Sequence, residues 1–253
     1  SSHPRPGAAG FDKGRAWRWM PVVEAYSGAD DWRGAPGVLM VNADGPCKGG
    51  LWASFGVEDS DWYKTPEVLG VMRTLLEAMR CGVFILDGGA NCYTYFEEQP
   101  ITLGMRIVNL GREARTDLTV ELQMCEFTQA IEPIRTRRSV PMLSAGETMR
   151  FSDVPISKTW PSDSRKITAL LKRGEQIVDE VNHDIYRWKP SHPPVYMQVK
   201  SGDFMLDGKR WRAHGVNYMP SSAVAAEDGA YFERWLSAQS YDPLVIQRDL
   251  ERV

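Results

Sequence analysis

Residues 201–222 read SGDFMLDGKRWRAHGVNYMPSS, and residues 231–253 read YFERWLSAQSYDPLVIQRDLERV. The Asp207-Gly208 pair in the first stretch is a strong signal for a tight turn between two short strands. We therefore expect a hairpin there, with residues 209–213 as its second strand. His214–Tyr218 then follows as a short strand that we expect to be buried.

The second stretch carries the signals of a helix. Asp242 is a good N-cap residue, and Pro243 suits the first helical position. Ile246, Leu250 and Val253 share one face at helical spacing. Because a loop that contains Pro220 separates the expected strand from this helix, the order is strand, loop and helix, as in one βα unit.

A β/α barrel starts in this way, but the remaining chain is too short to contain one. A (β/α)₈ barrel takes roughly 250 residues and places its catalytic groups at the C-terminal ends of several strands. Only about forty residues follow Arg210, which is enough for the first βα unit alone. We therefore expect the front of a larger enzyme.

The DGKRW and GVNYMP segments, followed by YDPLVIQRDL, resemble the start of the catalytic barrel in a clan of retaining glycoside hydrolases that includes the cellulase-like families. The resemblance covers residues 201–253. It implies a sugar-cleaving, bacterial-type parent with an acid/base glutamate after an asparagine on the fourth barrel strand and a nucleophilic glutamate on the seventh. Retaining enzymes need these carboxyl groups about 5 Å apart. No Asn-Glu pair occurs in this sequence, and we assign no catalytic residue within it.

Asn217 and Tyr218 are the candidate substrate-binding residues. They end the expected strand, at the edge where barrel enzymes build their sites. Tyr218 would stack on a sugar or hydrogen-bond to it, and Asn217 would orient a loop or a catalytic partner. The alternative is that both fill the top layer of the barrel and satisfy backbone groups. We expect His214, in contrast, to be a packed histidine.

Residues 99–190 have the pattern of an immunoglobulin-like β-sandwich. DLTVELQMCE at 117–126 alternates with the period of a half-buried strand. Further short strands, separated by turns and without helical stretches, are expected at 101–109, 134–140, 147–151, 167–172 and 177–186. Such a sandwich serves either as a rigid spacer, which we favour, or as a polysaccharide-binding module that uses exposed aromatic side chains.

Residues 191–253 comprise a linker and the start of the barrel. The Pro193-Pro194 pair stiffens the linker. Residues 195–199 are expected to add a short strand before the hairpin.

Residues 1–98 are expected to form an α+β or α/β segment, and the chain as a whole is expected to be an α+β multidomain protein. Thr65 and Pro66 start a helix as N-cap and first residue, and Gly82 ends it. Strands are expected at 36–42, 50–56 and 83–86. The RWMP segment at 18–21 and WASFGV at 52–57 are similar to the tail of class I glutamine-amidotransferase-like domains that precede some bacterial glycosidases. This resemblance implies that the nucleophile-elbow half of that domain lies upstream of Ser1.

This first segment holds most of the aromatic residues. Tryptophan and tyrosine offer flat faces to sugar rings, but buried tryptophan is also what a domain core contains. We favour the core for each tryptophan, with Trp32 and Trp62 as the exceptions expected to be exposed.

The stretch Gly88–Cys92 is the one candidate for a catalytic cysteine in this sequence. A glycine pair before a cysteine shapes a turn that exposes a thiol, but a nucleophile also needs a base. No histidine lies nearby in the sequence, and His183 belongs to a different predicted domain. We therefore interpret the stretch as a glycine-rich connection into a strand at 93–96.

Composition excludes several classes of function. The net charge of −3 argues against a nucleic-acid-binding protein, and no apolar run reaches the length of a membrane span. The four cysteines show no C-x-x-C spacing, so we expect free thiols and neither a metal nor a cofactor.

Two hypotheses follow. In the first, the chain is the N-terminal accessory portion of a glycoside hydrolase that acts on polysaccharide or oligosaccharide, and the rest of the barrel or a partner chain supplies the catalytic glutamates. In the second, it is a non-catalytic carbohydrate-binding or assembly module. An amidotransferase-like protein is a weaker third interpretation. The first predicts that this chain alone is inactive.

Overall fold

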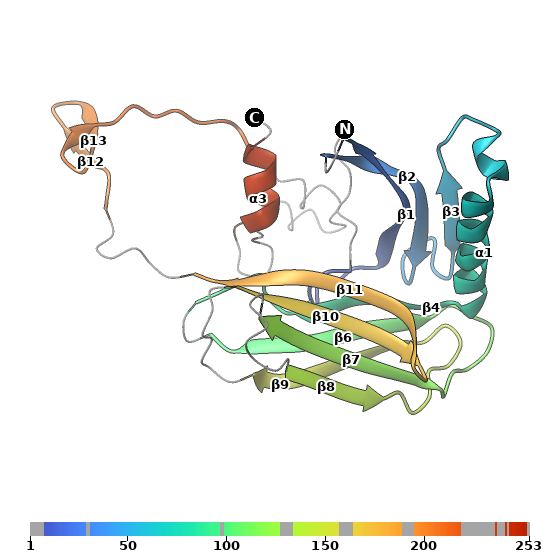
Figure 1. Cartoon of the computed structure of the whole chain (residues 1–253). Coiled ribbons are helices and arrows are strands. Elements are labelled where there is room, and N and C mark those ends of the chain that lie inside the picture. Colours follow the sequence, from blue (N-terminus) through green and yellow to red (C-terminus); the bar gives the residue numbers. More distant parts are fainter. Residues whose placement is uncertain are drawn as a thin grey trace.

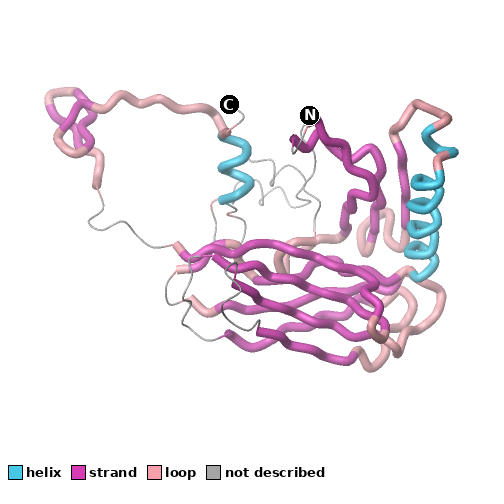
Figure 2. Tube along the Cα trace, in the orientation of Figure 1, coloured by secondary structure: helices cyan, strands magenta, loops and turns pink. Residues whose placement is uncertain are grey.

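A computed structural model describes residues 8–28, 31–96, 99–126, 134–156, 164–188, 195–218, 236, 241 and 243–251. Two packed β-sheets make up most of this part of the chain, and a smaller sheet and a helix lie on one side of them (Figures 1 and 2). No helix among the described residues combines the length and the hydropathy that a membrane span requires.

The sandwich consists of a five-stranded sheet, ordered β5-β11-β10-β7-β8, and a three-stranded sheet, ordered β4-β6-β9. All neighbouring strands are antiparallel except β5 and β11. The strands are β4 (Val83–Ala90), β5 (Thr94–Tyr95), β6 (Ile101–Asn109), β7 (Leu118–Glu126), β8 (Ile134–Ser139), β9 (Thr148–Ile156), β10 (Ser164–Arg173) and β11 (Gln176–Arg187).

The predicted strands of residues 99–190 are confirmed, and the mostly β structure agrees with the predicted sandwich. In β7 the alternating residues Leu118, Val120, Leu122 and Met124 are buried in the core between the sheets. This is the period-two pattern of a strand with one covered face. The immunoglobulin-like connectivity stays a prediction.

Strand β4 is buried along its whole length because both of its faces are covered. Val83 and Ile85 face the core of the sandwich, whereas Phe84 and Leu86 belong to a second core on the outer side. A strand covered on both faces reads as a continuous apolar run, as VFIL does here. The sequence predicts this strand as part of residues 1–98, whereas in the structure it pairs with β6 of the sandwich. The exact domain limits stay a prediction.

The second core lies beneath a small sheet and one helix. The sheet is ordered β1-β2-β3, with β1 at Trp17–Ser27, β2 at Asp31–Asn42 and β3 at Leu51–Phe55. A 3₁₀ turn, η1 (Trp62–Lys64), leads into helix α1 (Pro66–Cys81). Leu39, Val41 and Leu75 of these elements meet Phe84, Leu86 and Val108 of β4 and β6. The predicted helix and strands of this segment are confirmed.

The C-terminal region contains a three-stranded meander and a helix. The meander comprises β12 (Gln198–Lys200), β13 (Asp203–Leu206) and β14 (Lys209–Arg210), and the helix is α3 (Pro243–Leu250). Asp207 and Gly208 adopt φ of 50° and 71°, as the tight turn of a hairpin requires. The predicted hairpin, the short strand before it and the helix are therefore confirmed, although β14 is shorter than expected.

The buried strand expected at His214–Tyr218 is not found. These residues form no strand, and all except Tyr218 are exposed. A buried strand needs hydrogen-bonding neighbours on both sides and apolar cover on both faces. No described strand lies beside this segment to provide them. Of the predicted strand and helix, only the helix is found among the described residues, and the barrel stays a prediction.

Candidate functional site

Tyr218 and Asn217, the two candidate substrate-binding residues, differ in their surroundings. The hydroxyl group of Tyr218 donates a hydrogen bond to Oδ2 of Asp249 in α3, at 2.9 Å. This contact joins the end of the GVNY segment to the helix that follows it, across 31 residues of sequence. Asn217 is exposed, and so is His214, which was expected to be packed. A role for Asn217 or Tyr218 in substrate binding stays a prediction.

The structure brings His183 to the glycine-rich stretch Gly88–Cys92. Nε2 of His183 accepts a hydrogen bond from the backbone N–H of Ala90 at 3.0 Å. Its Nδ1 lies 3.1 Å from the backbone oxygen of Asp184, and because a carbonyl only accepts, the proton sits on Nδ1. This histidine is therefore a neutral imidazole that is bonded on both sides to backbone groups.

Gly89 allows His183 to approach the strand so closely. The φ of Gly89 is +126°, and a β-carbon at this position would lie 2.1 Å from Nε2 of His183. The glycine pair thus makes room for a ring that arrives from β11, and it does not shape a turn that exposes a thiol.

Cys92 is 3% exposed and has the chemistry of a structural thiol. Burial raises the pKa of Cys92, against the opposing effects of the Lys13 charge and of a hydrogen bond from Gln99. The thiolate is the nucleophilic form, and burial disfavours it at Cys92. Lys13 donates to the backbone oxygen of Asn91 at 2.8 Å and lies over the ring of Tyr93, which ties the N-terminal segment to the sandwich. The interpretation of Gly88–Cys92 as non-catalytic therefore agrees with the geometry.

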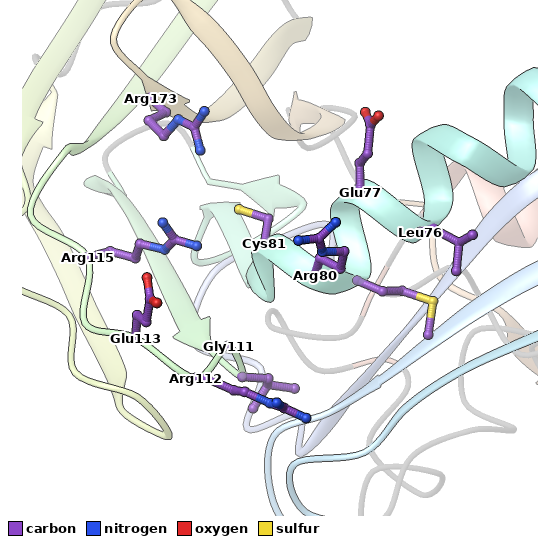
Figure 3. Close-up of a pocket in the computed structure, with 11 residues that line it drawn as sticks. Leu76, Glu77, Arg80, Cys81, Gly111, Arg112, Glu113, Arg115 and Arg173 are labelled. Atoms are coloured by element: carbon purple, nitrogen blue, oxygen red, sulfur yellow. The ribbon is translucent and has the colours of Figure 1, made fainter.

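A cavity of about 790 Å³ opens where the end of α1 meets the turn between β6 and β7. We call it the arginine cavity, after four of its lining residues. Figure 3 shows Arg80, Arg115 and Arg173 turned toward a common space, together with the thiol of Cys81. The cavity is lined by Leu76, Glu77, Met79, Arg80, Cys81, Leu110, Gly111, Arg112, Glu113, Arg115 and Arg173.

Sequence reasoning missed the arginine cavity. Its arginines come from α1, from the turn after β6 and from the end of β10, so no local motif links them. The one local signal is the turn at 109–112, which connects the strands β6 and β7. Within the described ranges, no group of histidine, cysteine and acidic side chains is arranged to hold a metal ion.

Exposed aromatic rings gather at one end of the sandwich. Phe96 and Trp188 are 59% and 48% exposed, and their ring centroids lie 5.4 Å apart in an edge-on arrangement. Trp62, predicted to be exposed, is half-buried against Phe55 and Tyr63, while Trp52 is 61% exposed. The side chain of Trp32 lies outside the described residues.

Comparison with known proteins assigns no family. No family model matches the chain, and no curated protein matches it. Among solved structures it is similar to a β-glucuronidase from glycoside hydrolase family 2, with a TM-score of 0.35 and 16% identity over 56% of this chain and 16% of the other. For a Bacteroides uniformis β-glucuronidase the TM-score is 0.30, with 18% identity over 67% and 18% of the two chains.

The Pseudomonas fluorescens alkylpurine DNA glycosylase AlkC is similar at a TM-score of 0.32, with 14% identity over 50% of this chain and 40% of that one. The chain thus spans less than half of the length of each of these proteins. At such identities and TM-scores the likenesses support no argument about function.

Proposed function

We propose that the chain is the N-terminal accessory portion of a retaining glycoside hydrolase that acts on polysaccharide or oligosaccharide. The catalytic glutamates lie outside this sequence, on later strands of a barrel that another part of the protein or a partner chain completes. In this arrangement the sandwich serves as a rigid spacer, and the segment at 211–218 leads into the barrel.

The hydrogen bond between Tyr218 and Asp249 carries the proposal. It ties the GVNYMP segment to the YDPLVIQRDL helix, which are the two segments that resemble the start of a glycosidase barrel. Residues 214–218 form no strand in this structure, so the hydrogen bond supports the proximity of these two segments and leaves the barrel strand a prediction. The sandwich, the DG hairpin and this pair of segments also follow one another in the order that the resemblance implies.

The purified chain is expected to release no product from aryl glycosides or β-glucans. Hydrolysis by a retaining enzyme needs two carboxyl groups about 5 Å apart, and the resemblance places both beyond this sequence. The measurement is nitrophenol release over a panel of aryl glycosides, with reducing-sugar release from β-glucan. Sustained turnover that follows the chain through purification would contradict the proposal.

A carbohydrate-binding module is the second candidate function, and the exposed pair Phe96 and Trp188 favours it. Aromatic faces pack on sugar rings, and the backbone N–H of Trp188 is fixed to the backbone oxygen of Tyr95 at 2.8 Å. If the chain binds glucan, Trp188→Ala should weaken retention in glucan affinity electrophoresis at least about tenfold. Trp52→Ala, which removes an exposed tryptophan from β3, is the matched control and should migrate like the unaltered chain. Equal migration of all three proteins with and without glucan would exclude this function.

A further inference from the structure

We propose that the arginine cavity binds a small molecule through a carboxylate, sulfate or phosphate group. Its lining carries four arginines and two glutamates, so the formal charges leave an excess of positive charge. The volume of about 790 Å³ lies within the range of roughly 300–1,000 Å³ that is typical of small-molecule sites. This inference is independent of the glycoside hydrolase proposal.

The positive charges of the cavity are poorly compensated by the protein. Arg80, Arg112 and Arg115 form no ion pair with any described residue. Arg173 lies 3.7 Å from Asp117, measured from Nε to Oδ2. Both partners of that pair are about half exposed, so solvent weakens their attraction. Figure 3 also shows Glu77 pointing away from the space that the arginines face. A bound anion would therefore neutralise positive charge that the described residues leave without an ion pair.

Arg115 gives the most specific indication of a ligand. Its Nε is inaccessible to solvent and has no hydrogen-bond acceptor among the described residues. A donor that is buried without a partner costs free energy, and native structures rarely leave one unsatisfied. Arginine offers its donors in a planar fork that matches the two oxygens of a carboxylate or of a phosphate. Because Nε cannot be reached from solvent in this conformation, an oxyanion in the cavity would bind the outer N–H groups of this fork.

The wall that carries Arg115 is held in place before any ligand binds. The buried side chain of Asn109 donates from Nδ2 to the backbone oxygens of Glu113 and Leu143, at 2.8 and 2.9 Å. The backbone of Arg115 pairs with that of Leu143 in both directions. These bonds fix the loop from Asn109 to Arg115, so binding would require little ordering of the protein.

The opposite wall is fixed by contact between two glycines. Gly82, with φ of +70°, ends α1 and packs so closely on the turn that a β-carbon there would lie 2.3 Å from the backbone nitrogen of Gly111. The backbone oxygen of Gly82 also accepts from the N–H of Leu110 at 2.7 Å. The attraction of a helix C-terminus for cations explains Arg80, which lies in the last turn of α1. It does not explain Arg112 and Arg115, which lie outside the helix.

Calorimetric titration of the chain with sodium sulfate, sodium phosphate and sodium glucuronate tests the inference. Glucose serves as the neutral control for glucuronate. At least one of the oxyanions should bind at millimolar concentration, and Arg115→Ala should weaken that binding by about tenfold or more because a charged, forked donor is lost. Arg115→Lys keeps the charge and should retain part of the affinity. Arg212→Ala removes an exposed arginine outside the cavity and should bind like the unaltered chain.

Comparing the three anions shows which kind of anionic group the cavity binds. Binding of glucuronate alone would indicate an acidic sugar, whereas binding of sulfate or phosphate would indicate a site for the tetrahedral anion. A cooperative thermal unfolding transition shows whether each variant is folded. If Arg115→Ala is not folded, Arg80→Ala takes its place in the titration. The inference is overturned if no oxyanion binds, if glucose binds as well as glucuronate, or if Arg115→Ala and Arg80→Ala bind as tightly as the unaltered chain.

Discussion

Arg18→Ala is expected to lower the free energy of unfolding by about 3–5 kcal/mol, because it leaves a carboxylate buried without its cation. Arg18 of β1 lies 2.5 Å from Oδ2 of Asp179 in β11, and both side chains are less than a tenth exposed. Arg18 also donates to the backbone oxygen of Ile85 at 2.7 Å, and Asp179 accepts from the N–H of Ile85 at 2.8 Å. This cluster joins the small sheet to both sheets of the sandwich. Urea unfolding followed by tryptophan fluorescence measures the loss.

An exposed ion pair of the same chain provides the control. Lys64 and Asp61 lie 2.7 Å apart, but their side chains are 74% and 81% exposed. Asp61→Ala should therefore leave the unfolding midpoint nearly unchanged. In contrast, the double variant Arg18→Met with Asp179→Leu should recover part of the stability lost in Arg18→Ala, since it removes both buried charges together. Equal, small effects of Arg18→Ala and Asp61→Ala would show that the buried pair does not join the layers.

Gly89→Ala is expected to cost about 3–5 kcal/mol, more than the strain of its backbone alone. An alanine at this φ of +126° is strained, and its β-carbon would overlap the ring of His183 at 2.1 Å. Removing the ring should relieve the overlap. The double variant Gly89→Ala with His183→Ala is therefore expected to be more stable than the sum of the two single changes predicts, by about 1 kcal/mol or more.

Gly146→Ala separates strain from overlap. Gly146 has φ of +78°, and nothing lies within 4 Å of the β-carbon position. This variant should lose about 1 kcal/mol, as expected for the left-handed conformation alone. Strict additivity between the changes at Gly89 and His183 in chemical denaturation would mean that the ring does not occupy the space above the glycine.

Helix α1 shows what sequence alone can predict. The N-cap signal at Thr65-Pro66 and the glycine at Gly82 are local, and the helix runs from Pro66 to Cys81 between them. The strands of the sandwich were also predictable, because one covered face leaves an alternating pattern within each strand. Both signals depend on neighbours in the sequence and need no knowledge of distant partners.

The position of β4 and the approach of His183 depend on distant partners and were not predictable in this way. A run such as VFIL shows that a strand is buried, but it does not show which two layers cover it. The bond from the N–H of Ala90 to Nε2 of His183 spans 93 residues of sequence. The sequence alone does not show that His183 packs on Gly89, so it does not explain why glycine is needed at this position.

The candidate site residues also include some that the sequence predicts and some that it does not. Helix α3 begins at Pro243, as the position of this proline predicts, whereas Asp242, the predicted N-cap, lies outside the described residues. The GVNY segment forms no strand, because strands need partners that α-helices do not. The arginine cavity combines side chains from α1, the turn after β6 and β10, and no spacing in the sequence connects them.

The most direct test of the central proposal uses the complete reading frame that contains this chain. Its protein product is assayed for glycosidase activity. We predict that this product hydrolyses at least one aryl glycoside with retention of anomeric configuration, while the chain of 253 residues releases no nitrophenol from the same panel. A reading frame that ends at Val253 without a partner chain, or a complete product that cleaves no glycoside, would contradict it.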